Sequence, residues 1–165
     1  MPDREQLRSL VSLALRVCRR ILANSADAED AAQDALERFL RSGFEGRSRP
    51  TTYLFTVATR VCIDRLRRLR RQERAYDEWA RQQEMVGLAE DRRSTDNMLL
   101  IGRLLSGADL SDDDAAIAIH YFVHGMTEQE IAEAMDMKRR TVGWRLARLT
   151  GKTRQMVSED GNDRS

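Results

Sequence analysis

Residues 126–149 carry the pattern that most restricts how this chain can fold, namely two short helices separated by a tight turn. Thr127 followed by Glu130 is a capping box, in which hydroxyl and carboxylate satisfy free amides at the start of a helix. The pattern breaks near Asp136, and a second helix starts near Lys138. Its apolar residues recur at helical spacing and predict a buried seam: Val142, Leu146 and Leu149. This arrangement predicts a helix-turn-helix, whose second helix enters a DNA major groove.

The second of these helices is strongly basic. Residues 138–154 contain seven Lys or Arg side chains and no acidic residue. Like charges on one helix repel one another, and a phosphate backbone would neutralise them. The alternative is a solvated amphipathic helix, but the capped helix and turn that precede it favour DNA binding.

Charge is segregated along the chain although the net charge of all 165 residues is only +1. Residues 1–75 hold 16 Arg and 10 acidic residues, whereas residues 76–165 hold 12 Lys or Arg and 17 acidic residues. Such segregation indicates separate surfaces for nucleic acid and for protein.

Several classes of protein are disfavoured by the sequence. Cys18 and Cys62 are too few for a disulfide framework and predict buried, reduced side chains. No apolar run is long enough for a membrane span and no signal peptide opens the chain, so we expect a cytoplasmic protein. His120 and His124 lie four residues apart, but two histidines alone are weak grounds for a metal site. We find no phosphate loop, nucleophile elbow or catalytic carboxylate pair, and predict a non-enzyme without cofactor or metal.

The first half of the chain predicts three helices by its 3.6-residue apolar period. They cover Leu7–Leu22, Asp27–Leu40 and Tyr53 to about Arg71. The second is acidic on its outer face. Its Asp34 and Glu37 lie beyond the first turn, so the helix dipole does not account for them and they need another reason. The third is rich in Arg opposite its apolar face, which is a footprint for nucleic acid.

The expected fold is all-α, with two small helical domains joined by a linker. The N-terminal domain spans residues 1–74, the linker 75–95, the helix-turn-helix domain 96–157 and a disordered tail 158–165. The C-terminal domain is expected to begin with a helix over 97–105 and a second over 110–124 that is capped by Ser111.

Three stretches, taken together, resemble the extracytoplasmic-function (ECF) sigma factors of bacterial RNA polymerase. ADAEDAAQDAL is similar to the helix that binds core polymerase, TTYLFTVATRVCIDRLRRLRR to the segment that melts and reads the minus-ten element, and GMTEQEIAEAMDMKRRTVGWRLARL to the helix-turn-helix that reads the minus-thirty-five element. The resemblance implies three partners: core RNA polymerase, promoter DNA and an anti-sigma factor.

The resemblance also implies a role for individual residues in three sets. Core polymerase would bind Asp27, Asp30, Gln33, Asp34 and Glu37. The minus-ten element would meet Tyr53, Arg60, Arg65, Arg67, Arg68 and Arg71. The minus-thirty-five element would meet Lys138, Arg139, Arg140, Thr141, Gly143, Trp144, Arg145 and Arg148. Within the last set, Arg140 and Arg145 are expected to read bases and Arg148 to contact phosphate.

This chain differs from the usual family pattern at a few positions. Tyr53 replaces a Trp and keeps an aromatic ring. Asp136 replaces the Gly of the helix-turn-helix turn, where Asp tolerates the left-handed conformation. Gly143 and Trp144 replace small polar or basic residues, so Gly143 would permit close approach to DNA while Trp144 would either contact DNA or pack on the preceding helix.

Two other functions stay open from the sequence. One is a helix-turn-helix transcriptional regulator that uses its N-terminal helices to dimerise and binds a palindrome without polymerase. The other is a sigma-like protein that sequesters partners and does not initiate transcription. Co-purification with core polymerase separates the sigma factor from the regulator.

Overall fold

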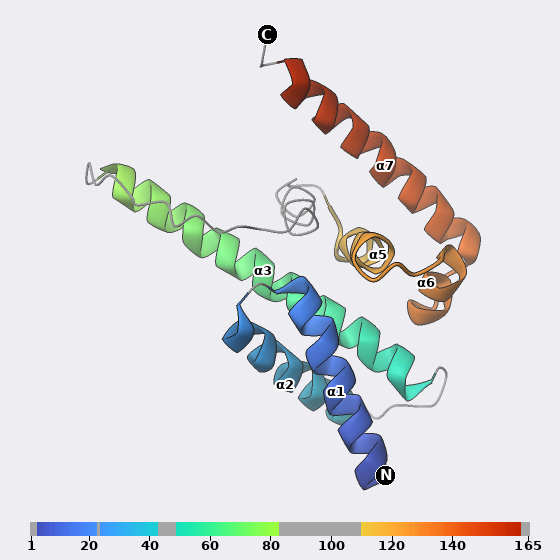
Figure 1. Cartoon of the computed structure of the whole chain (residues 1–165). Coiled ribbons are helices and arrows are strands. Elements are labelled where there is room, and N and C mark those ends of the chain that lie inside the picture. The colour runs from blue at the N-terminus through green and yellow to red at the C-terminus, as the bar shows by residue number, and fades with distance from the viewer. Residues whose placement is uncertain (1–2, 23, 43–48, 83–109, 163–165) are drawn as a thin grey trace.

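The computed structural model of this protein describes residues 3–22, 24–42, 49–82 and 110–162. Every regular element within these ranges is a helix, which confirms the predicted all-α class. In chain order they are α1 (Arg4–Ile21), α2 (Ser25–Arg41), α3 (Pro50–Gln82), α5 (Asp112–Phe122), α6 (Glu128–Ala134) and α7 (Arg139–Asn162), as Figure 1 shows.

Side-chain caps fix where most of these helices start. The Asn24 side chain accepts a hydrogen bond from the Asp27 amide at the start of α2, and the Ser111 side chain accepts one from the Asp114 amide at the start of α5. At α6 the predicted capping box of Thr127 is present. Hydrogen bonds from the Thr127 amide and hydroxyl lower the pKa of the Glu130 carboxyl, because they stabilise its charged form.

Helices α1, α2 and α3 form a tightly packed N-terminal bundle. Small side chains line the contact, which lets the helices approach closely; those that are fully buried include Ala14, Cys18, Ala28, Ala31, Ala35, Ala58 and Cys62. Both cysteines are free and buried, as the sequence predicted. The apolar faces of this bundle follow the helical period, except that Leu7, Val11 and Leu40 are exposed.

Helix α5 forms the centre of the C-terminal domain. All of its residues from Asp114 to His120 are buried, and it packs against α3, α6 and α7. The predicted seam of α7 is buried too, with Val142, Leu146 and Leu149 at most 5% exposed.

The turns of this domain use left-handed backbone where the sequence indicated it. Gly125 ends the α5 segment with a φ of 65°, and Asp136 adopts a φ of 52° between α6 and α7. Asp136 thus takes the conformation usually left to Gly, as expected from the sequence.

Helix α3 is the long central helix of the molecule. Helices α1 and α2 cover one side of it, and α5 and α6 approach the other (Figure 1). Buried side chains from both sides form one continuous apolar cluster, which runs from Leu10 through Leu54 to Leu146. None of the described helices combines the length and the apolar character that a membrane crossing requires.

Two helices continue past the ends expected from the sequence. Helix α3 runs to Gln82, so the predicted linker begins inside it, and α7 runs to Asn162, into the segment expected to be a disordered tail. The apolar period fades in both places, but that period reports burial, whereas residues 72–82 still lack Gly and Pro and favour helix. The rest of the linker and the helix expected over 97–105 lie outside the described residues.

Candidate nucleic-acid and polymerase interfaces

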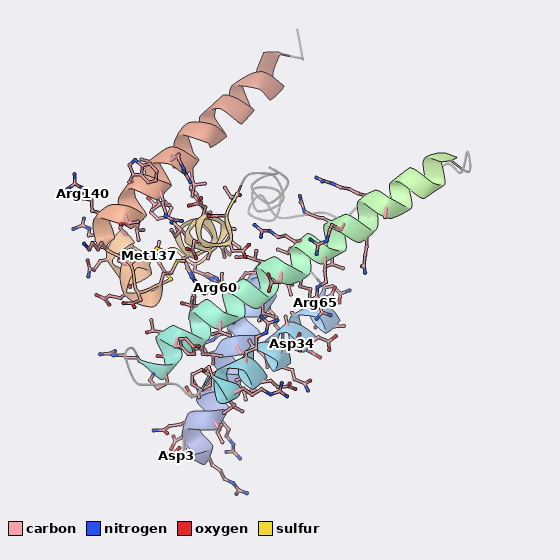
Figure 2. The ribbon with its side chains drawn as sticks, turned by 180° about the vertical axis from the view of Figure 1, so that it is seen from behind. Asp3, Asp34, Arg60, Arg65, Met137 and Arg140 are labelled. Carbon is pink, nitrogen blue, oxygen red and sulfur yellow. The ribbon has the colours of Figure 1, made fainter. Side chains whose placement is uncertain are left out.

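The start of α7 presents three exposed basic side chains, Lys138, Arg139 and Arg140. Arg140 lies at the outer edge of the C-terminal domain, away from α3 (Figure 2). The Arg139 Nε lies 3.6 Å from Glu128 Oε2, and both side chains remain well exposed, so this ion pair is weak and leaves Arg139 free to exchange partners. The N-terminal part of the second helix is where a helix-turn-helix reads base edges.

Gly143 faces α6 instead of the outer surface. A Cβ atom at this position would lie 3.2 Å from the Glu128 Oε2. The position that a Cβ would take is therefore filled by Glu128, and close approach of DNA to Gly143 stays a prediction. Glycine leaves room here for the Glu128 carboxylate of the neighbouring helix.

Trp144 lies on the outer face of α7 and is 62% exposed. The Arg148 guanidinium carbon lies 5.0 Å from its ring centroid, which is a cation–π contact. Of the two alternatives for this ring, packing on the preceding helix is excluded, and Trp144 is available to a ligand of the helix. Thr141, one turn earlier, is half-buried.

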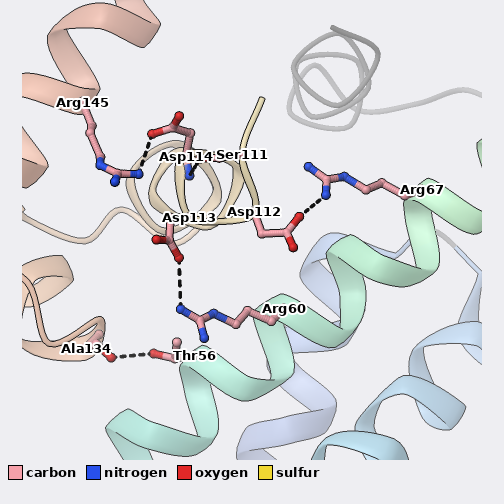
Figure 3. Close-up of polar contacts among 9 residues, drawn as sticks. All are labelled: Thr56, Arg60, Arg67, Ser111, Asp112, Asp113, Asp114, Ala134 and Arg145. Atoms are coloured by element: carbon pink, nitrogen blue, oxygen red, sulfur yellow. Dashed lines mark hydrogen bonds and ion pairs between the residues drawn. The ribbon is translucent and has the colours of Figure 1, made fainter. Parts of the chain in front are cut away.

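A buried carboxylate holds two of the predicted DNA-binding arginines. Asp114 is 2% exposed, and its two oxygens accept hydrogen bonds from Arg145 Nη1 at 3.0 Å and Arg148 Nη2 at 2.6 Å. The Arg145 contact appears in Figure 3. These bonds join α5 to α7, so the Arg145 guanidinium is directed toward the domain interior. Its predicted role as a base reader is not supported by this position.

Arg65 connects two of the predicted sets. Its Nη2 lies 3.0 Å from Asp27 Oδ1 and 3.1 Å from Asp30 Oδ2, and its Nε also donates to Asp27 at 3.2 Å. Asp27 and Arg65 are each about three-quarters buried, whereas Asp30 is exposed. A residue expected to bind DNA and two expected to bind polymerase thus hold α2 against α3.

The remaining acidic surface of α2 is open. Gln33, Asp34 and Glu37 are all exposed, and Asp34 projects from α2 (Figure 2). Glu37 has only an exposed partner on its own helix, Arg41 at 3.6 Å. These three residues are the part of the predicted polymerase set that is free to meet another protein.

The two aromatic residues at the start of α3 are both packed. The Tyr53 ring is half-buried and its centroid lies 5.9 Å from that of Phe39 on α2. Phe55 packs instead against two histidine rings, at 5.4 Å from His120 and 4.6 Å from His124. Tyr53 therefore contributes to the bundle, and its ring is only partly exposed for stacking on a base.

Two further arginines of the predicted minus-ten set are paired with α5 (Figure 3). Arg60 Nη2 lies 3.1 Å from Asp113 Oδ1. Arg67 pairs with Asp112 and donates a second hydrogen bond of 2.9 Å to the Leu110 carbonyl. Arg68 and Arg71 are both exposed on the same helix. The basic face of α3 is thus partly covered by the C-terminal domain.

The two histidines lie at this same contact. The ring nitrogens of both are buried and have no hydrogen-bond partner within the described part of the chain. Burial, followed by the nearby charges of His124 and Arg60, lowers the pKa of His120 to about 3. Burial and Arg20 lower the pKa of His124 to about 4. Both rings are therefore neutral at physiological pH.

The acidic run Asp112, Asp113 and Asp114 is the functional feature that the sequence interpretation missed. The helix dipole alone would account for acidic residues in a first turn, yet each of these carboxylates contacts an arginine of another helix. The sequence did contain an indication of these contacts, because three consecutive acidic residues are more than the one or two that the first turn of a helix needs.

Comparison with known proteins agrees with the predicted resemblance over the N-terminal helices. Residues 7–72 match the family Sigma-70 region 2. Among solved structures, the chain is similar to the co-crystal structure of the sigma factor RpoE in complex with the anti-sigma factor NepR from Bartonella quintana. The TM-score is 0.49 at 16% sequence identity, with 94% of this chain and 96% of that chain covered. A comparison with curated proteins gave no match. Residues 7–72, which form α1, α2 and the first part of α3, are therefore similar to Sigma-70 region 2.

Proposed function

We propose that this protein is a sigma factor of the ECF type, which directs core RNA polymerase to specific promoters and initiates transcription. The observation that carries the proposal is the Sigma-70 region 2 match over residues 7–72, the segment that forms α1, α2 and the first part of α3. A second feature supports it, since α6 and α7 have the arrangement of a helix-turn-helix with exposed basic residues at the start of α7.

Each surface then has one partner. The open acidic part of α2, with Gln33, Asp34 and Glu37, binds core polymerase. The arginines of α3 approach the minus-ten element and its melted strand, mainly through phosphates. The start of α7 reads the minus-thirty-five element, with Arg140 at base edges and Lys138 at phosphate.

In this role the protein is a regulatory subunit of RNA polymerase. Polymerase supplies catalysis, and this chain needs no cofactor or metal for its role. From the family resemblance we also expect an anti-sigma factor as a partner and action in the cytoplasm.

The decisive experiment combines co-purification with core polymerase and run-off transcription from a promoter library. A sigma factor forms a complex with core polymerase and yields transcripts from a defined subset of promoters. Binding to a palindromic duplex without polymerase would favour a helix-turn-helix regulator. Binding to core polymerase without any transcript would favour a sequestering protein, and either result would overturn the proposal.

A further inference from the structure

The two cysteines of the chain meet inside the N-terminal bundle. Cys18 lies on α1 and Cys62 on α3, and both side chains are 0% exposed. A hydrogen bond joins them, in which the Cys62 thiol donates to the Cys18 sulfur. Two thiols that are 44 positions apart in the sequence are thus in direct contact where α1 packs against α3.

Small residues beside the cysteines let the two helices approach closely. Ala14 lies four residues before Cys18 and Ala58 lies four residues before Cys62, so each alanine shares a helix face with its cysteine. Both alanines are fully buried. A disulfide needs Cα atoms within about 7 Å and sulfur atoms about 2 Å apart. Thiols that already touch across such a contact reach this geometry by side-chain rotation.

The hydrogen bond makes the two thiols chemically unequal. It lowers the pKa of Cys18 because it stabilises the thiolate, although burial acts in the opposite direction. The same bond, together with burial, raises the pKa of Cys62. The thiolate is the nucleophilic form of cysteine, so Cys18 is the sulfur that attacks an oxidant and Cys62 is the thiol that reacts second.

We propose that Cys18 and Cys62 form an oxidation site for hydrogen peroxide, whose product is a disulfide bond between α1 and α3. The Cys18 sulfur attacks a peroxide oxygen, so that an S–O bond forms, the O–O bond breaks and one water leaves with the thiol proton. The Cys62 sulfur then attacks the Cys18 sulfur, so that the S–S bond forms, the S–O bond breaks and a second water leaves. Two thiols are oxidised by two electrons, and one peroxide is reduced to two waters.

The disulfide holds the N-terminal bundle together when an oxidant is present. It closes a loop that contains the whole of α2, so it restricts the unfolded chain and favours the folded one. Neither cysteine reaches the surface, so the reaction requires a transient opening of the bundle and is slower than that of an exposed thiol. This site goes beyond the proposed function, because neither polymerase nor DNA takes part in its chemistry.

The test treats the folded, full-length chain with hydrogen peroxide, then unfolds it in urea with iodoacetamide to block the remaining thiols. A digest without reductant should contain one crosslinked peptide pair that joins Cys18 to Cys62, and dithiothreitol should remove it. The oxidised chain should melt about 10 °C higher than the same sample after dithiothreitol. Any oxidised methionine is present in both samples, so the difference reports the disulfide alone.

Serine variants test which sulfur attacks the peroxide. In Cys62→Ser the hydroxyl still donates to Cys18, which should form a sulfenic acid that dimedone labels, because no second thiol is present to react with it. In Cys18→Ser the remaining Cys62 should be labelled about tenfold less. The variant with both substitutions is the control whose melting temperature should not respond to dithiothreitol.

Three results would overturn the proposal. One is two thiols that iodoacetamide still blocks fully after a peroxide dose that oxidises all glutathione in the same buffer. Another is a disulfide that joins two chains instead of two helices. The third is dimedone labelling of Cys62 that equals or exceeds that of Cys18. The first two are measured on the unmodified protein, so they do not depend on the folding of any variant.

Discussion

Arg148 Nη2 donates a 2.6 Å hydrogen bond to Asp114 Oδ2, so that α7 is anchored on a carboxylate that is 2% exposed. Arg145 reaches the other oxygen of the same carboxylate at 3.0 Å. A buried carboxylate is stable only when it is paired and hydrogen-bonded. The orientation of α7 relative to α5 therefore depends on Asp114.

Replacing Asp114 tests this anchor. Asp114→Asn keeps the size of the side chain but removes the charge that both guanidinium groups meet, and should lower the free energy of unfolding by about 1–3 kcal/mol. Urea denaturation measures the change. Asp136→Asn is the matched control, because Asp136 is exposed and Asn also tolerates its φ of 52°, so its effect should stay within about 0.5 kcal/mol. Similar losses in both variants would contradict the anchor.

Substitutions in α7 should distinguish an arginine that reads bases from an arginine that stabilises the fold. Arg140→Ala should change the preferred minus-thirty-five sequence, since an exposed arginine there can bind guanine in a bidentate manner worth about 1–3 kcal/mol of discrimination. Arg145→Ala should instead lower stability as Asp114→Asn does, with the sequence preference kept. Transcription from a randomised minus-thirty-five library with each variant gives the measurement. A changed preference in Arg145→Ala alone would reverse these two assignments.

The acidic surface of α2 should be required for polymerase binding. Asp34→Arg reverses a charge at an exposed position, and should weaken binding to core polymerase about tenfold at low salt with a smaller effect at high salt. Asp34 is preferable to Asp30, because Asp30 pairs with Arg65 and its reversal would also disturb the α2–α3 contact. Glu5→Arg on α1 is the control of equal charge. Fluorescence anisotropy with labelled protein measures both, and equal weakening in the control would argue for a general charge effect.

Acidification should open the contact between α5 and α3. His120 faces Phe55, His124 and Arg60, and His124 faces Phe55 and Arg20, so among the described residues no carboxylate partner offsets protonation of either ring. Both pKa values are lowered in the closed arrangement, to about 3 and about 4, so the open arrangement binds more protons below pH 6.5.

The direction of the pH dependence follows from this difference in bound protons. The contact between α5 and α3 is most stable above pH 6.5, and its stability decreases as the pH falls toward 4 and then 3. At pH 5.5 it should be about a hundredfold weaker than at pH 7.5, about tenfold for each histidine. Small-angle scattering across this range measures the opening, and His120→Gln with His124→Gln is the control that should lose the pH dependence. A constant radius in the parent chain from pH 7.5 to 5 would contradict the prediction.

Local features of the sequence determined the helices and their caps. The Thr127–Glu130 capping box, the Ser111 cap and the turn at Asp136 depend on neighbours within four residues, and all three are present. The buried seam of α7 followed in the same way from helical spacing, because a side chain's face is fixed by its position in the helix. The family resemblance over the N-terminal helices relied on the same local information.

Only the tertiary structure decided which charges stay free. The sequence assigned Arg60, Arg65, Arg67 and Arg145 to DNA, yet each meets a carboxylate that lies between 31 and 53 residues away along the chain. An arginine has the same local pattern whether its partner is a phosphate or a distant aspartate. The partner of each arginine is set by which helices pack together. The packing of α5 against α3 and α7 in turn depends on contacts between residues that are far apart in the sequence.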